Sequence, residues 1–156
     1  MESFMNHDIL IGRGGVDTLI DDTAQAEILE QLLASWTGPL ARVLIVGPDI
    51  TRSHSGAGAI ACKIYYRLSP FAQVDLIPAL GSHDPMTRDE LARMYPSIPP
   101  ERILLHNWRT EAISLGEIPV ETIEQLSEGK LHYSIDVRVN RHLVETPYDL
   151  ILSVGQ

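Results

Sequence analysis

The sequence has little of what marks a secreted or membrane protein. Its 156 residues include one cysteine, Cys62, and a single cysteine with no second to pair with is typical of a reducing compartment. No apolar run approaches the roughly 18 to 20 residues that a bilayer span needs, and no basic-then-apolar signal opens the chain. We therefore expect a cytoplasmic protein without a membrane partner.

Positive charge is also scarce. Lys and Arg total 12 against 21 Asp and Glu, so the formal net charge is -9, and the basic residues form no run. Because binding to nucleic acid depends on clustered positive charge, we expect no nucleic-acid partner. The sequence has no HxxxH or CxxC spacing and no GxSxG motif, so it predicts neither a self-contained metal site nor a serine-hydrolase elbow.

What is present is an ordinary globular composition with strands and helices in alternation. Hydrophobic residues make up 44% and charged residues 21% of the chain. The apolar patterns predict strands near residues 8–15, 42–49, 73–80, 101–106, 131–140 and 148–155, and helices near 21–38, 55–69 and 86–96, with a turn or short helix at 119–129. Alternation of this kind predicts a Rossmann-like α/β domain over residues 1–156, with an open, mostly parallel sheet flanked by helices.

Ligands of open parallel sheets bind beyond the carboxyl ends of the strands, so the loops there are the ones to inspect. The loop GPDITRSHSGAG follows the apolar run RVLIV of the strand predicted near 42–49 and carries Asp49, Thr51 and Arg52. Arg52, together with backbone N–H groups at the start of the next helix, could hold a phosphate or a carboxylate. Alternatively, Asp49 and Thr51 cap the helix and Arg52 pairs with an acid at the surface.

A second loop, ALGSHDPMT, follows the next predicted strand and carries His83 on a Gly-Ser turn. Histidine exchanges protons near neutral pH, and this position would bring it to a substrate. The alternative is an exposed turn histidine with no chemical role. His54 and His106 are weaker candidates, because each also suits a structural role: His54 in the first loop, His106 beside a polar turn.

Four segments together resemble one known family. GPDITR, ALGSHDPMTRDEL and HNWRTEAISLGEIP follow three successive predicted strands, and YDLILSVG is the last predicted strand; the four occur in the order typical of the lactate racemase family. The resemblance covers roughly residues 40 to 156, whereas residues 1 to 39 match only in general character. Members of this family are racemases and epimerases of 2-hydroxy acids. They use a tethered nickel-pincer nucleotide that shuttles a hydride while two histidines exchange the hydroxyl proton.

The resemblance implies a role for each matching residue. His83 corresponds to the first of the two histidines, the general acid/base that faces the substrate hydroxyl, and Arg52 to the arginine that holds the substrate carboxylate. Asp49 and Thr51 correspond to positions that help to bind the cofactor nucleotide. The family often has a second acid before the aspartate, whereas this chain has Pro48, so a two-carboxylate arrangement is not expected.

The resemblance also implies that part of the enzyme is missing. In the family, the strand equivalent to DLILSVG leads to the second histidine, then the tethering lysine, then a nickel-ligating histidine, and this sequence stops at Gln156. Neither Lys63 nor Lys130 lies where the tether is expected. We therefore expect the N-terminal domain of a larger two-domain isomerase, truncated at its C-terminal end and inactive alone. Its partners would be a small 2-hydroxy acid, the missing portion, and a second copy held through the exposed last strand.

Two other interpretations remain open from the residues alone. One is a stand-alone anion-binding α/β module that uses Arg52 and the adjacent helix start. The other is a fragment with a purely structural role. The sequence does not say which 2-hydroxy acid the enzyme would accept.

Overall fold

A computed structural model describes residues 11–155 of the chain and divides it into two compact units, Met1–Pro39 and Leu40–Gln156. In the first unit the predicted helix is confirmed as α1 (Asp22–Ala34), whose N-cap Asp21 accepts a hydrogen bond from the Ala24 N–H at 2.8 Å. The strand predicted near 8–15 falls partly on residues 1–10, which lie outside the described residues, and residues 11–15 form no strand. That the whole chain is one domain stays a prediction.

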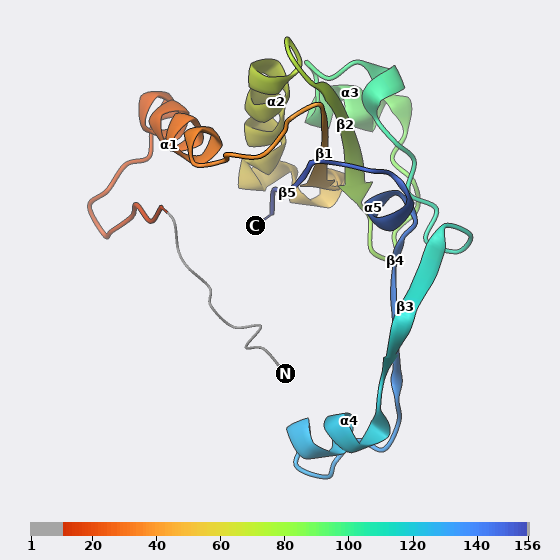
Figure 1. Ribbon diagram of the computed structural model, residues 1–156. Helices are drawn as coiled ribbons and strands as arrows, with labels where there is room; N and C mark the ends of the chain where they lie inside the picture. Colours follow the sequence, from red (N-terminus) through yellow and green to blue (C-terminus); the bar gives the residue numbers. More distant parts are fainter. Residues whose placement is uncertain (1–10, 156) are drawn as a thin grey trace. The chain divides into compact units, whose positions relative to one another are not determined.

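The second unit is built on a parallel three-stranded sheet (Figure 1). Its central strand is β1 (Arg42–Pro48), which pairs in parallel with β2 (Gln73–Ala79) on one side and with β5 (Leu150–Ser153) on the other. The predicted α/β architecture is therefore confirmed. Because the three strands run in one direction, the loops that follow them meet at the carboxyl ends of the strands, on one side of the sheet.

The core explains why β1 is central. Val43, Leu44 and Ile45 have no exposed surface, as expected for a strand covered on both faces. One face is covered by the predicted helix, confirmed as α2 (Ala57–Leu68), whose buried Ala61, Ile64 and Leu68 lie at helical spacing. This packing holds the start and the end of the β1 loop in fixed positions.

Short helices complete the loops around the sheet. After β1 the chain forms a 3₁₀ turn, η1 (Ile50–Ser55), and after β2 it forms α3 (Arg88–Met94). The helix predicted near 86–96 is confirmed as α3, which begins at a capping box in which Thr87 and Glu90 exchange two hydrogen bonds. The strand predicted at 101–106 is wrong: a second 3₁₀ turn, η2 (Pro100–Arg102), precedes a single parallel bridge between Leu76 and Ile103.

A separate antiparallel hairpin follows this bridge. Its strands are β3 (Ala112–Ile118) and β4 (Ile135–Asn140), and α4 (Val120–Leu126) lies in the connection between them (Figure 1). The predicted strand at 131–140 is confirmed in its second half and the short helix at 119–129 is confirmed, whereas the sequence pattern missed β3. A last helical turn, α5 (His142–Glu145), leads from the hairpin back to β5.

The last predicted strand forms but is not fully buried. Along β5 half-buried and exposed residues alternate, and Ile151 is 39% exposed. Within residues 11–155, β5 pairs only with β1, so it is an edge strand rather than a central one. Self-association through this edge stays a prediction. In the same residues no helix has the length and apolar character needed to cross a bilayer.

One carboxylate joins the starts of β1 and β5. Asp149 accepts hydrogen bonds from the backbone N–H groups of Ala41 and Arg42, both at 2.8 Å. We expect Asp149→Ala to lower the free energy of unfolding by about 2 kcal/mol, because two charge-assisted bonds to backbone are lost. Urea denaturation measures the difference. Asp149→Asn keeps one acceptor oxygen, so its free energy of unfolding should lie between those of the wild type and Asp149→Ala. An alanine variant as stable as the wild type would contradict a stabilising role for these two hydrogen bonds.

Candidate functional site

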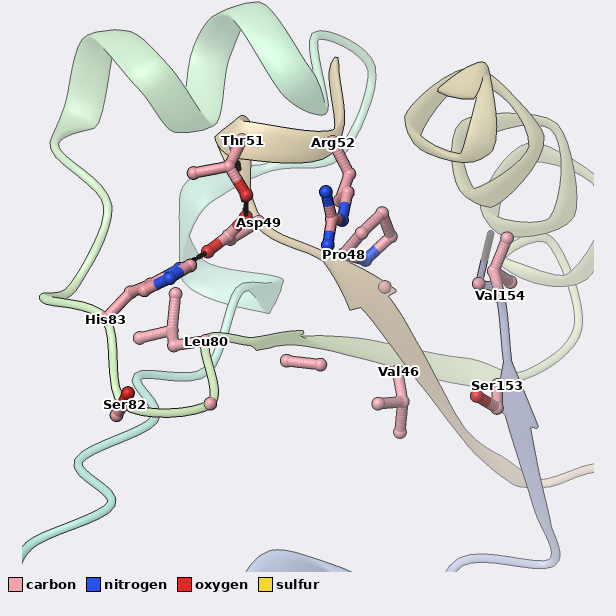
Figure 2. Close-up of a pocket in the computed structure, with 14 residues that line it drawn as sticks. Val46, Pro48, Asp49, Thr51, Arg52, Leu80, Ser82, His83, Ser153 and Val154 are labelled. Carbon is pink, nitrogen blue, oxygen red and sulfur yellow. Dashed lines mark hydrogen bonds and ion pairs between the residues drawn. The ribbon is translucent and has the colours of Figure 1, made fainter. Parts of the chain in front are cut away.

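The residues that follow β1, β2 and β5 enclose a pocket of about 430 Å³ (Figure 2). All four residues that the sequence singled out, Asp49, Thr51, Arg52 and His83, line it. They come from two loops that are more than 30 positions apart in the chain. The parallel pairing of β1 with β2 brings these loops together.

Asp49 is the buried member of the group. It follows β1 directly, is 5% exposed, and caps η1 by accepting a hydrogen bond from the Thr51 backbone N–H at 3.0 Å. The Thr51 hydroxyl donates to the same oxygen, Oδ1. Asp49 therefore caps η1, whereas the sequence alternative placed this cap on the predicted helix, whose N-cap is Gly56 without a side-chain hydrogen bond. The cap on η1 uses only one of the two carboxylate oxygens of Asp49.

His83 occupies the second oxygen. It stands on a turn after β2 in which Gly81 adopts a left-handed conformation (φ +59°), and its backbone N–H donates to the Leu80 carbonyl at 3.0 Å. Its ring Nδ1 contacts Oδ2 of Asp49. The Asp49 side chain is 6% exposed and the His83 side chain 58% exposed, so the pair has one buried end and one end open to solvent.

The charge of Asp49 fixes the proton on the imidazole. Burial raises the pKa of the Asp49 carboxyl, but the hydrogen bonds from His83 and Thr51 outweigh it and hold that pKa below its ordinary value of 3.8. The carboxylate is ionised at neutral pH and can only accept hydrogen bonds. Nδ1 of His83 must then carry a proton, which leaves Nε2 of the neutral ring with a free lone pair.

Arg52 supplies positive charge to the same pocket. It is exposed, it interrupts η1 with non-helical backbone angles (φ -101°, ψ 18°), and its side chain extends toward Pro48 (Figure 2). The start of α2 lines a different pocket, with Gly56, Gly58 and Ala59. This separation disfavours the module in which Arg52 and the helix start hold one anion. A carboxylate at Arg52 would instead lie in the pocket that His83 also lines.

The end of β5 forms a third wall that the sequence analysis did not single out. Ser153, Val154 and Gly155 line the pocket, and the Val154 N–H donates to the Val46 carbonyl at 2.8 Å (Figure 2). The rule that ligands meet the carboxyl ends of parallel strands contains the signal. It becomes specific only once the order β2-β1-β5 is known, because that order places the last strand next to the first loop.

The two weaker histidine candidates do not line the pocket. His54 is exposed on η1, and His106 lies beside the end of the hairpin. Nδ1 of His106 lies 2.8 Å from Nδ2 of Asn140, a side chain that is 5% exposed and whose Oδ1 accepts from the His142 N–H at 2.9 Å. Because an amide nitrogen can only donate, His106 accepts through Nδ1 and must be neutral. It acts as a structural acceptor at the base of the hairpin.

This contact predicts a pH dependence of stability. Burial lowers the pKa of His106 below its ordinary 6.5, against the nearby Glu111 carboxylate, which raises it. As pH falls, the imidazole of His106 is therefore protonated in the unfolded chain before it is protonated in the folded one. The stabilisation that the neutral His106 gives the folded chain is complete above pH 6.5 and is lost as the pH falls below that value. We expect the difference in unfolding free energy between wild type and His106→Gln to shrink from pH 7.5 to pH 5.5. A difference independent of pH would contradict a neutral His106.

The described part of the chain offers no group of three or more His, Cys, Asp or Glu side chains that could hold a metal ion. At the pocket the two available groups, Asp49 and His83, are already bonded to each other. The chain has two lysines, Lys63 and Lys130, and neither lines the pocket. The residues present therefore do not fit a nickel site or a tether for a cofactor.

Comparison with known proteins gives one family and two solved structures of similar fold. The model of the lactate racemase N-terminal domain family matches residues 14–156, so the match extends well into the first 39 residues. A crystal structure of a protein from Thermotoga maritima has a TM-score of 0.67 at 24% identity and is matched over 84% of this chain. The lactate racemase apoprotein from Thermoanaerobacterium thermosaccharolyticum has a TM-score of 0.53 at 16% identity, over 83% of this chain.

At these identities the two structures show the shared fold. The matched region makes up 32% of the Thermotoga chain and 31% of the Thermoanaerobacterium chain, so this chain spans about a third of the length of either. A search of curated proteins gave no match.

Proposed function

This chain belongs to the lactate racemase N-terminal domain family, and from that premise we propose that it is the N-terminal part of a longer enzyme that racemises or epimerises a 2-hydroxy acid. The observation that carries the proposal is the pocket in which Arg52 and the Asp49–His83 pair lie together. A 2-hydroxy acid has a carboxylate and a hydroxyl on neighbouring carbons. The pocket offers one group for each.

Arg52 would bind the substrate carboxylate. Its guanidinium presents parallel N–H donors whose spacing matches the two oxygens of a carboxylate, and its exposed position leaves it accessible to a ligand entering the pocket. This contact orients the acid so that the hydroxyl-bearing carbon lies on the side of the β2 loop. Arg52 therefore acts in binding and orientation.

His83 would move the hydroxyl proton. With Nδ1–H donated to Asp49, the lone pair on Nε2 accepts the proton from the substrate hydroxyl, and the resulting imidazolium is stabilised by the buried carboxylate. The α-hydrogen would leave as hydride to an acceptor held by the longer protein, so that a carbonyl forms. When the acceptor gives the hydride back to the carbonyl carbon, Nε2–H would return the proton to the oxygen and the hydroxyl would re-form. Asp49 orients the ring and balances its charge. A direct contact of Asp49 and Thr51 with a cofactor stays a prediction.

The nickel-pincer nucleotide belongs, on this proposal, to the longer protein. Since the pocket residues do not fit a nickel site, no step here is assigned to the metal, and the chain alone is expected to be inactive. The work of this domain is to hold the carboxylate and to exchange the hydroxyl proton.

Racemisation by the longer protein tests the proposal. The protein would be loaded with nickel-pincer nucleotide, its nickel content measured, and enantiopure 2-hydroxy acids, beginning with lactate, followed by polarimetry. We expect at least one acid to lose its optical rotation, and the 156-residue chain under the same conditions to leave it unchanged. A nickel-loaded protein that racemises no 2-hydroxy acid would refute the proposal.

A further inference from the structure

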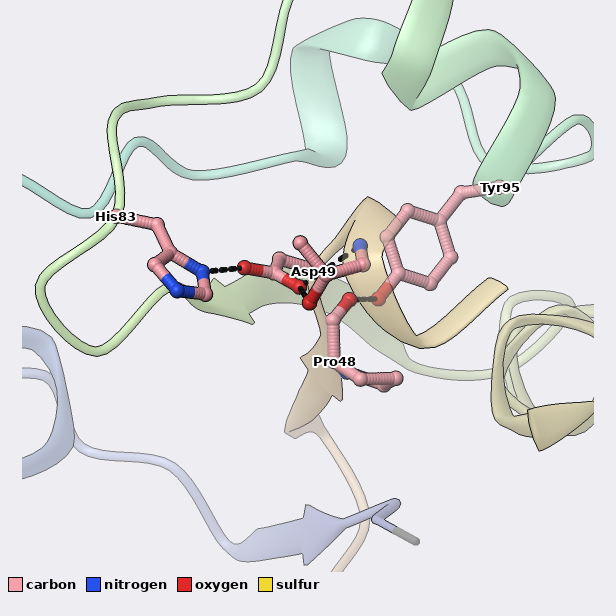
Figure 3. Close-up of polar contacts among 5 residues, drawn as sticks. Pro48, Asp49, His83 and Tyr95 are labelled. Carbon is pink, nitrogen blue, oxygen red and sulfur yellow. Dashed lines mark hydrogen bonds and ion pairs between the residues drawn. The ribbon is translucent and has the colours of Figure 1, made fainter. Parts of the chain in front are cut away.

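One segment of the chain contacts two adjacent residues of the β1 loop (Figure 3). Residues 80–95 run from the end of β2 through α3. Near the start of this segment His83 contacts the Asp49 carboxylate, and at its end the hydroxyl of Tyr95 donates a hydrogen bond to the Pro48 carbonyl. The two contacts fix the Pro48–Asp49 peptide from both sides.

The Tyr95 side chain is buried where it makes this contact. Tyr95 is the C-cap of α3 and is 1% exposed, so no water can replace its partner. Burial first, and then the nearby Cys62 and Asp49, raise the pKa of the Tyr95 phenol above its ordinary value of 10.0. The hydroxyl is therefore protonated at neutral pH, where it donates to the Pro48 carbonyl.

In β1, Gly47 leaves room for the hydroxyl of Tyr95. A Cβ atom added at Gly47 would lie 2.5 Å from Oη of Tyr95, closer than a Cβ atom can approach an oxygen. Only glycine leaves room at this position, one residue before Pro48 and two before Asp49. Two features that the sequence analysis did not connect, a glycine in β1 and a tyrosine after α3, thus serve the same contact.

We propose that Tyr95 is a positioning residue for the His83–Asp49 pair. By holding the Pro48 carbonyl it fixes the direction in which the next residue, Asp49, presents its carboxylate to His83. The inference rests on the proposed function for its chemical meaning, since a misaligned Asp49 would leave His83 with the wrong ring nitrogen protonated. Tyr95 touches neither the pocket nor any ligand in it, because its side chain is not among the pocket's lining residues.

The tautomer of His83 measures this alignment directly. A free neutral imidazole favours the proton on Nε2, whereas a carboxylate facing Nδ1 holds it there. Nitrogen-15 chemical shifts of the imidazole distinguish the two forms in the 156-residue chain at pH 9, where histidine rings are neutral. In the wild type we expect the Nδ1–H form to dominate.

Tyr95→Phe removes the hydroxyl and keeps the ring. We expect the ratio of the Nδ1–H to the Nε2–H form to fall about three- to tenfold, the change that follows from weakening one hydrogen bond. Tyr148→Phe is the matched control: its hydroxyl also donates a buried hydrogen bond, to the Asp75 carboxylate at 3.2 Å, but it lies near the starts of β2 and β5, whereas the pocket lies at their ends. Both variants should lower the thermal midpoint, and only Tyr95→Phe should change the tautomer.

A pair of variants tests the steric half of the inference. Gly47→Ala forces the new methyl group against the Tyr95 hydroxyl, so it should lower both the thermal midpoint and the Nδ1–H fraction. In Gly47→Ala/Tyr95→Phe the clashing oxygen is gone and the nearest ring atom is Cζ at 3.2 Å. The double variant should therefore be more stable than Gly47→Ala alone. If any variant is too unstable, sucrose restores the folded state for the same measurement.

The outcomes separate the two proposals. If Asp49→Ala leaves the His83 tautomer unchanged, the pair itself and the proposed chemistry fail. If Asp49→Ala shifts the tautomer but Tyr95→Phe does not, or if Tyr148→Phe shifts it equally, only the positioning role of Tyr95 is overturned.

Discussion

Replacing His83 with alanine in the longer, cofactor-loaded enzyme is expected to lower kcat by about 10²- to 10⁴-fold, the usual contribution of a positioned general acid or base. The reason is the free Nε2 lone pair, which the bond from Nδ1–H to Asp49 leaves available to the substrate hydroxyl. KM should change little, because Arg52 still binds the carboxylate. Initial rates of racemisation over a range of substrate concentrations measure both constants.

The matched control for this variant lies on the neighbouring loop. His54→Ala removes an exposed imidazole on η1 that does not line the pocket, and it should keep wild-type kinetics. Asp49→Asn keeps the size of the orienting side chain but removes its charge, and it should lower kcat with unchanged KM. Full activity in His83→Ala would exclude His83 as the proton-transfer group.

Replacing Arg52 should change KM more than kcat, the reverse of the effect expected for His83. We expect Arg52→Ala to raise KM by about 10²-fold, because charge-assisted hydrogen bonds to a ligand are worth roughly 1.5 to 3 kcal/mol each and a guanidinium can make two. Arg52→Lys keeps the charge but not the paired donors, so its KM should lie between those of wild type and Arg52→Ala. Steady-state kinetics with one 2-hydroxy acid check the order.

A control variant separates the effect of lost positive charge on KM from the effect of losing the contact between Arg52 and the carboxylate. Arg88→Ala removes an equal charge from an exposed site outside the pocket and should leave KM within about twofold, since surface charges in salt are screened over roughly 10 Å. If Arg88→Ala raised KM as much as Arg52→Ala, a general electrostatic effect would replace carboxylate binding as the explanation.

The parts of the fold that the sequence predicts are those with strong local signals. Val43 to Val46 form an uninterrupted apolar run, and this run became the central strand β1. Thr87 and Glu90 have capping-box spacing, and α3 begins there. Both patterns depend on neighbours within four residues, which a single sequence displays in full.

The parts that it misses depend on contacts over longer distances. The segment ERILLH has strand composition, but Leu105 is 67% exposed and only Ile103 pairs with the sheet. In β3, Gly116 and a bulge next to it interrupt the alternation, so pairing with β4 rather than local preference makes the strand. The half-exposure of β5 follows from its position at the edge, which no local pattern encodes.

At the site, too, the sequence predicts what local patterns show and misses what depends on long-range contacts. The sequence placed Asp49 and His83 in loops at the ends of strands, but their contact spans 34 residues and exists because β1 and β2 are neighbours. Nothing local distinguishes Tyr95 from any other buried tyrosine. Its role is visible only where its hydroxyl meets Pro48 in the space that Gly47 leaves.

On the proposed function, Arg52 and His83 contact two adjoining groups of one ligand. A titration of the 156-residue chain, nitrogen-15 labelled in arginine and histidine, with lactate and with propionate, which lacks the hydroxyl, tests this pairing. Both acids should shift the Arg52 Nε resonance, and only lactate should shift the ring nitrogens of His83. The claim is contradicted if lactate shifts Arg52 to saturation and leaves His83 unmoved, or if neither acid shifts Arg52.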